Sequence, residues 1–508
     1  MISAYTGTQV RQAEKPLLES GTGAALMQRA AYGLANAVVR ELLGRGQRRY
    51  GASVAVLAGK GNNGGDGLFA AALLAGRGMS TTAVLTSGDA HTEGLAAFEK
   101  AGGRVIRLAA ENVAEASAAA RRADVLIDAV LGTGAQGGLR GPAAALIREL
   151  ELSRPRSRSP LVVACDIPSG VDADTGEAQA PVLTADLTVT FGAAKTGLLT
   201  DPGANFSGRV QLVPIGIETH LPAPDLRRLE AEDLAGLLSR PERRSHKYSR
   251  GVLGVVAGSD RYPGAAVLAC QGALASGVGM VRYLGPPGVA DLVLRACPEV
   301  VCAPEGPADT HVQAWLLGPG LDDGASAQLE RVREAAATGL PTVADAGALP
   351  ALPRELSERT VLTPHAGELA ALLARYGDDS GRDGVRDAPL AAARRAARLT
   401  GATVLLKGAT TLVAAPAGAV FSQAEATPWM ATAGSGDVLA GVLGSLLAQL
   451  GGQDEAFAAR GITAGDRWAG MAAMAASLHG RAGGRASAGG PVTASAIAQA
   501  LPAVLRDL

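Results

Sequence analysis

Short apolar runs alternate with alanine-rich stretches of helical spacing along the first half of the chain. The runs are rich in β-branched residues, as in strands that are buried on both faces. They lie at residues 53–58, 82–86, 124–128, 161–166 and 187–191. Helical segments fall between several of them, at 68–77 and 142–152, after one or two amphipathic helices within 20–43. This rhythm predicts a parallel sheet with helices on both faces.

The alternation of strand-like and helix-like segments stops at residue 214 and resumes after residue 250. Residues 214–250 are rich in proline and charge, which places a domain boundary near residue 225. Further strands are expected at 252–257, 314–317, 341–345, 360–363, 403–407 and 411–415, and polar exposed loops at 153–160 and 377–389. We therefore predict an α/β protein with two three-layer αβα domains, residues 1–225 and 226–508.

Composition narrows the class of protein. Apolar residues make up 47% of the 508 residues and aromatic residues only 3%, which suits layered packing of Ala, Val and Leu. The net charge is −1 without a polybasic block, so neither nucleic acid nor a membrane is an expected partner. The four cysteines form no C-x-x-C pair, so no zinc site or disulfide framework is expected. With no secretory signal and no long apolar run, we expect a cytoplasmic protein.

The most informative chemical pattern is the turn Thr432-Ala433-Gly434-Ser435-Gly436-Asp437, which precedes an apolar run at 438–448. A glycine-rich turn that opens a buried helix offers unpaired N–H groups and a positive dipole end to a phosphate. A carboxylate there would repel the phosphate unless it takes a proton from the attacking group. The turn therefore indicates phosphoryl transfer to a hydroxyl. The alternative is that Asp437 is an ordinary helix-capping residue.

Three strand ends in the first half carry polar motifs. Residues 59–67 hold the G-x-G-x-x-G spacing of a dinucleotide site, but Asp66 would disfavour a pyrophosphate. The amide and carboxylate oxygens of this segment suit a sugar, an amide or a hard cation. Asp128 leads into the glycine-rich run 132–138, and Asp166 leads into 167–172. A single aspartate there would be a turn or cap residue, but three converging strand ends predict a site.

These motifs, with Phe191-Gly-Ala-Ala-Lys-Thr-Gly197, resemble the NAD(P)HX epimerase family over most of residues 1–220. The resemblance implies a Rossmann-like domain that interconverts R and S epimers of hydrated NAD(P)H. It implies potassium (K⁺) ligands at Asn63, Asp128 and Ser169, and an acid/base role for Asp166, with Lys195 as a second candidate. It also implies substrate contacts at Asn62, Asn63, Gly64, Gly65, Asp66, Gly132, Thr133, Gly134, Ala135, Gln136, Gly137, Gly138 and Asp166.

The second half has its own strand-end motifs. One strand leads towards Tyr262-Pro263-Gly264-Ala265, and another ends in Gly318-Pro319-Gly320-Leu321. His365, in Thr363-Pro-His-Ala-Gly-Glu368, is a candidate site residue, and a capping role is the equally weighted alternative. The turn Lys407 to Thr411 joins two strands and could hold nucleotide phosphates.

In order, these motifs and the Gly434 to Asp437 turn resemble the ribokinase-like superfamily over about residues 235–505, and within it ADP-dependent NAD(P)HX dehydratase. The resemblance implies ADP as co-substrate, Mg²⁺ on its phosphates and Asp437 as the catalytic base. It implies nucleotide contacts at Lys407, Gly408, Ala409, Thr410, Thr411 and Gly436, and substrate contacts at Ala265, Gly320, His365 and Asp437. Asp322 departs from the family's usual glycine at that position, which leaves the loop conformation open.

Together the two resemblances imply nicotinamide nucleotide repair. One domain would epimerise R- and S-NAD(P)HX, and the other would dehydrate the S epimer to NAD(P)H with ADP, giving AMP and phosphate. The expected partners are the small molecules NADHX, NADPHX, ADP and AMP, together with further copies of this chain in a homo-oligomer. One alternative is a ribokinase-like kinase of a small alcohol with an N-terminal ligand-binding domain. Another is an N-terminal module that binds without catalysis.

Overall fold

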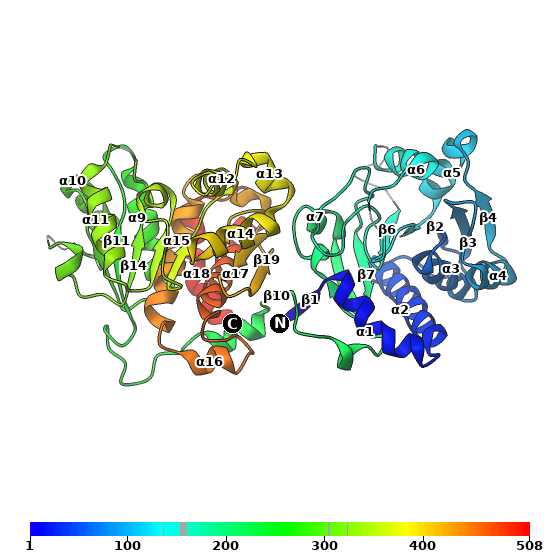
Figure 1. Ribbon diagram of the computed structural model, residues 1–508, viewed down its shortest axis with the longest axis horizontal. Helices are drawn as coiled ribbons and strands as arrows, with labels where there is room; N and C mark the ends of the chain where they lie inside the picture. Colours follow the sequence, from blue (N-terminus) through cyan, green and yellow to red (C-terminus); the bar gives the residue numbers. More distant parts are fainter. Residues whose placement is uncertain (136, 153–159, 303–304, 323) are drawn as a thin grey trace. The chain divides into compact units, whose positions relative to one another are not determined.

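The computed structural model describes the chain except residues 136, 153–159, 303–304 and 323. It divides into two compact units, Ser3–Asp225 and Leu226–Leu508, with Met1–Ile2 belonging to the second (Figure 1). Each unit has its own hydrophobic core. Within the described ranges, no helix combines the length and the apolar character that crossing a bilayer requires.

The N-terminal unit is built on a seven-stranded sheet in the order β4-β3-β2-β5-β6-β7-β9. All its strand pairs are parallel, as the apolar runs predicted. Its strands are β2 (Ser53–Ala58), β3 (Ser80–Leu85), β4 (Arg104–Arg107), β5 (Val125–Ala129), β6 (Leu161–Cys165), β7 (Leu187–Phe191) and β9 (Arg209–Val213). The short strands β1 (Ile2–Tyr5) and β8 (Ala194–Lys195) pair in parallel through Tyr5 and Lys195.

Helices cover both faces of this sheet, because successive side chains of each strand enter opposite cores. Val54 and Val56 of β2 pack in the core shared with one helical layer, whereas Ala55 and Leu57 pack in the other. The first layer contains α1 (Gly7–Glu19), α2 (Gly23–Gly44), α3 (Asn62–Ala75) and α4 (Thr92–Lys100), and the second contains α5 (Val113–Arg122) and α6 (Gly141–Leu152) (Figure 1).

The helices of this unit differ in part from the sequence prediction, which named no range for α4, α5 or α7 (Gly203–Ser207). Helix α1 was not predicted, and α3 begins at Asn62 rather than at residue 68. The glycines of the 62–67 segment lie in the first turns of α3, where neighbouring backbone and side chains leave no room for a Cβ. A Cβ on Gly64 would lie 2.0 Å from the carbonyl oxygen of Gly59, and one on Gly67 would lie 2.6 Å from the Cβ of Ala129. Glycine here permits close packing instead of marking a loop.

The sheet of the C-terminal unit has the order β13-β12-β11-β14-β15-β16-β17-β18-β19-β10. It is parallel from β13 to β17, antiparallel through β17, β18 and β19, and parallel again between β19 and β10. The strands are β10 (Leu226–Arg228), β11 (Val252–Val256), β12 (Met280–Tyr283), β13 (Val301–Cys302), β14 (Ala314–Leu317), β15 (Thr342–Ala344), β16 (Thr360–Leu362), β17 (Thr403–Leu406), β18 (Thr411–Ala414) and β19 (Val420–Gln423).

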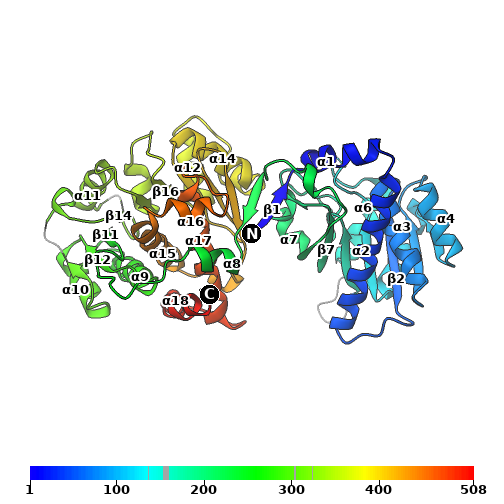
Figure 2. The same cartoon turned by 90° about the horizontal axis from the view of Figure 1, so that it is seen from below.

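Helices again form two layers around the sheet (Figure 2). One layer contains α9 (Pro263–Ala275), α10 (Pro287–Ala296), α15 (Ser435–Leu450), α17 (Arg467–Ser487) and α18 (Ala494–Asp507). The other contains α11 (Ser326–Ala337), α12 (Ala366–Ala374) and α14 (Pro389–Thr400), and short helices lie at α8 (Ala231–Leu237), α13 (Gly381–Asp387) and α16 (Asp454–Ala458). The short helix α7 belongs to the N-terminal unit. The predicted two-domain α/β fold with layered helices is thus observed.

Of the two predicted loops, one contains a helix and the other lies almost entirely outside the described residues. The segment predicted as a loop at 377–389 instead contains α13, so that prediction is wrong. Only Val385 of this helix is buried, and the helix is held by packing against α12 and α14, which polar composition does not reveal. Of the loop predicted at 153–160, residues 153–159 lie outside the described residues.

Candidate active sites

In the N-terminal unit the strand order reverses between β2 and β5, because the chain builds outwards from each of these strands to opposite edges. Loops that follow such a pair diverge and leave a crevice at the carboxyl ends of the strands. Here the two loops start in contact: a Cβ on Gly59 would lie 2.0 Å from the Val130 carbonyl oxygen. A cavity of about 890 Å³ opens beside this contact.

Most of the predicted substrate contacts of this unit line the cavity. These are Asn62, Asn63, Asp66, Gly132, Thr133, Gly134, Ala135, Gly138 and Asp166, together with the second acid/base candidate Lys195. Gly64 and Gly65 are buried in α3 and do not line it, and Gly137 lines a smaller pocket. Gln136 lies outside the described residues.

Asp166 and Lys195 form a buried ion pair. The Lys195 Nζ donates to Asp166 Oδ1 at 2.5 Å, and the Thr190 hydroxyl and the Phe191 N–H donate to the same oxygen at 3.2 Å each. The Thr133 hydroxyl donates to Oδ2. Burial acts to raise the pKa of Asp166, but the Lys195 charge and these hydrogen bonds outweigh it and lower that pKa. Asp166 is therefore an ionised carboxylate that accepts a proton far more readily than it donates one.

Two other carboxyl groups at the cavity shift in the opposite direction. Burial raises the pKa of Asp66 well above its usual range, and the charges of Asp166 and Glu14 add to this rise. The Asp66 Oδ1 is buried with no hydrogen-bond partner among the described residues. Burial also raises the pKa of Glu14, which enters the cavity from α1.

Glu14 was missed because α1 was not predicted, although a capping signal marks the start of this helix. The Thr6 hydroxyl accepts from the Gln9 N–H at 3.1 Å, and the Gln9 side chain accepts from the Thr6 N–H at 2.9 Å. The Thr-x-x-Gln spacing is the sequence signature of this capping box.

The three predicted potassium ligands converge on the loop after β5. The Asn63 Nδ2 donates to the Leu131 carbonyl oxygen at 2.9 Å, and the Leu131 N–H donates to Ser169 Oγ at 2.9 Å. Ser169 donates to Asp128 through its hydroxyl at 2.6 Å and through its backbone N–H at 2.9 Å. Burial raises the pKa of Asp128. The Asn63 Oδ1 is buried without a hydrogen-bond partner among the described residues, and such a set of oxygens fits a hard cation.

In the C-terminal unit, too, the loops after two strands at a reversal of strand order are in contact. Its strand order reverses between β11 and β14, and the Gly258 N–H after β11 donates to the Pro319 carbonyl oxygen after β14 at 2.7 Å. Gly320 has a φ of +69°, and a Cβ there would lie 2.6 Å from the Cβ of Ala265. Two predicted substrate contacts, Ala265 and Gly320, are thus brought together.

Asp322, the departure from the family pattern, has a clear local role. It accepts from the Ser259 hydroxyl at 3.2 Å and from the Gly324 N–H at 2.9 Å. The aspartate therefore links the loop after β14 to the loop after β11.

The predicted phosphate turn lies at the start of α15. Gly434 is the N-cap with a φ of +85°, and a Cβ on it would lie 2.4 Å from Leu268 Cδ1. The first amides of the helix have no intrahelical acceptor, so they are available to an anion. The Ser435 hydroxyl lies 3.4 Å from His479 Nε2, and burial lowers the pKa of His479 to about 4, so this histidine is neutral.

Asp437 lies in the first turn of α15 beside a charged cluster. Burial raises its pKa to about 6, the Asp345 charge adds to the rise, and the Lys407 charge opposes it. Lys407 Nζ lies 2.8 Å from Asp345 Oδ1 and 3.7 Å from Glu368 Oε2. A carboxyl with a pKa near 6 is mainly ionised at neutral pH and is suited to general-base catalysis. Asp345 was not predicted, although it closes a strand as Asp128 and Asp166 do.

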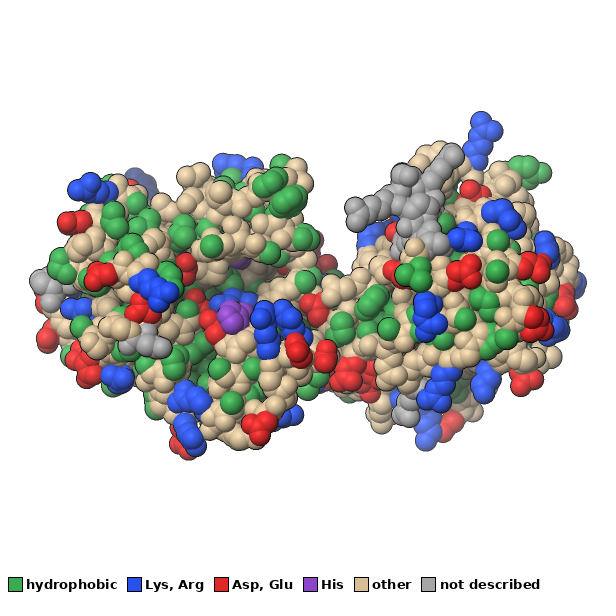
Figure 3. Space-filling model, turned by 90° about the horizontal axis from the view of Figure 1, so that it is seen from above, with side chains coloured by type: hydrophobic (Ala, Val, Ile, Leu, Met, Phe, Trp, Pro, Cys, Tyr) green, Lys and Arg blue, Asp and Glu red, His purple; other side chains and the backbone are tan. Residues whose placement is uncertain are grey.

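Lys407 also approaches the phosphate turn, because a Cβ on Gly436 would lie 3.7 Å from its Nζ. In the turn that follows, Gly408 and Ala409 are exposed, Thr410 is buried and Thr411 begins β18. The ammonium group therefore lies near the start of α15, and its charge acts on Asp437. Figure 3 shows a hollow on this unit with histidine and basic side chains at its edge.

His365 caps α12, which was the alternative to a direct site role. Its Nδ1 accepts from the N–H groups of Gly367 and Glu368 at 3.0 and 3.1 Å. Its ring is exposed, and His365 is bridged to Lys407 through the backbone. A substrate contact by this histidine stays a prediction.

Comparisons with known proteins agree with two catalytic units. Residues 253–502 match the family model described as NAD(P)H-hydrate dehydratase, and residues 23–197 match that of the YjeF-related protein N-terminus. A bifunctional NAD(P)H-hydrate repair enzyme of Mycobacterium tuberculosis is 43% identical over 455 residues, covering 87% of this chain and 89% of the relative. Its counterpart in Moorella thermoacetica is 35% identical, covering 95% of this chain and 92% of that protein.

Among solved structures, the ADP/ATP-dependent NAD(P)H-hydrate dehydratase of Bacillus subtilis, co-crystallised with ATP and Mg²⁺, is 25% identical with a TM-score of 0.46. The match covers 55% of this chain and 98% of that one.

The folds and sites define a two-unit α/β enzyme with a ligand cavity at the strand reversal of the N-terminal unit and a charged cluster beside the start of α15 in the C-terminal unit. The extent and identity of the curated matches then settle the family. This chain belongs to the bifunctional NAD(P)H-hydrate repair enzymes.

Proposed function

We propose that this chain repairs hydrated nicotinamide nucleotides in two steps. Residues 1–225 interconvert the R and S epimers of NAD(P)HX, and residues 226–508 dehydrate the S epimer to NAD(P)H. The observation that carries this proposal is the combination of family membership with an acid/base group in each crevice, Asp166 in one and Asp437 in the other. The cavity of the first unit, about 890 Å³, is within the size range of small-molecule sites.

Asp166 is the proposed base of the epimerase. Water adds to an enamine at the carbon bonded to nitrogen, so the hydroxyl that changes configuration lies next to the ring nitrogen. The ionised Asp166, held by Lys195, takes a proton from the oxygen that adds to this carbon. Asn62, Asn63 and Thr133 line the same cavity and are proposed substrate contacts.

Asp437 is the proposed base of the dehydratase. It takes the proton of the ring hydroxyl, whose oxygen attacks the terminal phosphate of ADP and releases AMP. The amides at the start of α15 and the Lys407 ammonium stabilise the charge of the transferred phosphoryl group. The C–O bond then breaks, phosphate leaves, and loss of the proton on the neighbouring carbon restores the ring double bond.

Two cations belong to the proposal. Asn63, Asp128 and Ser169 would hold potassium, which would supply a fixed positive charge beside the cavity. Magnesium would accompany the phosphates of the nucleotide and neutralise part of their charge.

The test is to incubate the full chain with mixed R- and S-NADHX, ADP, Mg²⁺ and K⁺, and to follow both epimers by chromatography. Full recovery of NADH, faster than the R epimer converts without protein, supports both activities. Recovery of the S fraction alone removes the epimerase, and no recovery overturns the proposal. Accumulation of a stable phosphorylated product would support the small-alcohol kinase instead.

A further inference from the structure

Epimerisation through loss and return of water needs an acid as well as a base. The leaving hydroxyl must be protonated, and the water that returns to the other face must be deprotonated. Asp166 is a poor donor, because Lys195 and Thr133 bond both of its oxygens and keep it ionised. The acid must be another group at the cavity.

Helix α1 forms one wall of this cavity. Val10, Glu14 and Leu18 lie four residues apart, so they share one face of the helix, and all three line the cavity. Glu14 is half-buried, and among the described residues its carboxyl group has no hydrogen-bond or ion-pair partner. An unpaired carboxyl group on a largely apolar wall is positioned for a ligand rather than for structure.

Charged groups near Glu14 lie on α1, on α3 and at the buried Lys195–Asp166 ion pair. Arg11 lies one turn away on α1, but its guanidinium donates to the Thr133 carbonyl oxygen at 2.8 Å. Lys195 is bonded to Asp166, and Asp66 adds a further acidic group from α3. Burial raises the pKa of Glu14 and the Asp166 charge adds to this, whereas Lys195 and Arg11 oppose it. Glu14 therefore keeps its proton to higher pH than a free glutamate does.

We propose that Glu14 is the general acid of the epimerase site, working with Asp166 as the base. This inference rests on the proposed epimerase function. The Glu14 proton moves to the ring hydroxyl, the C–O bond breaks with its electron pair, and water leaves as the ring nitrogen lone pair forms a C=N bond. A water molecule then adds to the other face of that carbon and gives its proton to Asp166. The C=N electron pair returns to nitrogen, so no oxidant or reductant is needed. Proton exchange with water then returns Asp166 to its carboxylate and Glu14 to its acid form.

The arrangement also accounts for the surplus of acidic groups at this cavity. The species formed between the two steps is a cation, delocalised over the ring nitrogen and carbon. Glu14 becomes a carboxylate as the cation forms, and Asp166 is already one, so both stabilise it electrostatically. Two groups whose surroundings push their pKa values apart are the usual basis of an acid and base pair.

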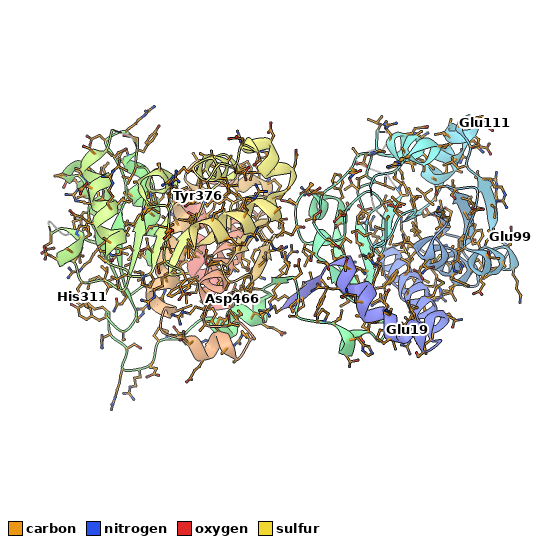
Figure 4. The ribbon with its side chains drawn as sticks, in the orientation of Figure 1. Glu19, Glu99, Glu111, His311, Tyr376 and Asp466 are labelled. Atoms are coloured by element: carbon orange, nitrogen blue, oxygen red, sulfur yellow. The ribbon has the colours of Figure 1, made fainter. Side chains whose placement is uncertain are left out.

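The test compares Glu14→Gln with Glu14→Asp and with Glu19→Gln in the full chain. Glu19 lies at the end of the same helix (Figure 4), is exposed, and forms only a surface pair with Lys15 at 3.7 Å. Glu14→Gln should lower the epimerase kcat about a hundredfold to ten-thousandfold, with a small change in KM. It should also remove the loss of activity that wild type shows as pH rises through the Glu14 pKa. Glu14→Asp should restore part of the rate, and Glu19→Gln should match wild type.

Dehydration of pure S substrate in each variant reports only that the C-terminal unit has folded, because each unit has its own core. An unchanged thermal denaturation curve, together with the partial rescue by Glu14→Asp, reports that the N-terminal unit has folded. If wild type epimerises while Glu14→Gln keeps a rate within about threefold of it and an unchanged pH profile, this inference is wrong. A rise in KM alone would also overturn it, because it would show that Glu14 only binds substrate. If wild type itself does not epimerise, the proposed function fails instead.

Discussion

Both units place an aspartate near a lysine at a crevice beside parallel strands, but the two carboxyl groups shift in opposite directions. Lys195 donates directly to Asp166, and the pKa of that buried carboxyl falls. Lys407 instead bonds to Asp345, and the pKa of Asp437 rises to about 6. The nearby lysine does not fix the direction of the shift. Burial acts to raise both pKa values, and the direction depends on whether the charge of the lysine and the hydrogen bonds given to that carboxyl group outweigh burial.

The largest expected effect is on Asp437, because it is the proposed base of the chemical step. Asp437→Asn keeps the size and the capping capacity of the side chain but removes the base, so dehydration should fall about a hundredfold to ten-thousandfold. Epimerisation should persist. Chromatography of both epimers measures the two activities, with the exposed Asp309→Asn as control. Near-normal dehydration would mean that Asp437 is only a helix cap.

Asp166→Asn should impair epimerisation and leave dehydration intact, the opposite of Asp437→Asn. Dehydration of S substrate should continue, while R-to-S conversion should fall about a hundredfold or more. The substitution also leaves the buried Lys195 without a counter-charge, so thermal denaturation should show a lower melting temperature for this variant. Asp89→Asn, on the surface of the same unit, should change neither property. Loss of epimerisation together with loss of the unfolding transition of the N-terminal unit would indicate unfolding rather than loss of a base.

Potassium dependence should belong to the N-terminal unit alone. Asp128→Ala removes a buried carboxylate that lies beside Asn63 and Ser169, so the potassium concentration for half-maximal epimerisation should rise about tenfold or more. Dehydration of S substrate serves as the internal control. Epimerase activity that responds neither to potassium nor to this substitution would show that the site is misassigned.

The smallest expected effect is a change in the pH dependence of dehydration. In wild type, dehydration should decline as pH falls below about 6, because Asp437 becomes protonated. Asp345→Asn removes a negative charge that raises the pKa of Asp437, so this pKa should fall. The acid limb of kcat/KM should then move to lower pH by about one unit. The profile of Glu368→Gln offers a milder comparison, since that carboxylate lies further from Lys407. A limb that moves to higher pH in Asp345→Asn would contradict the comparison.

The sequence predicted most central strands and many candidate site residues, because both depend on local pattern, but it missed strands such as β4, β9, β12 and β19. Apolar runs located β2 and β7 to the residue, and aspartates at strand ends located Asp128 and Asp166. Glycine was harder to interpret. Gly434 is the N-cap that precedes α15, whereas Gly64 lies inside α3. The sequence around each glycine does not distinguish the two positions, and the tertiary structure does.

Tertiary structure alone decided which charges meet. Glu14 reaches the epimerase cavity from a helix more than a hundred residues before Asp166, and Asp345 takes the hydrogen bond of Lys407 across the sheet. A pKa depends on burial and on distances between side chains that are remote in sequence, which no local pattern contains. The sequence by itself therefore named the proposed bases, whereas the fold set their protonation and brought the proposed acid to the cavity.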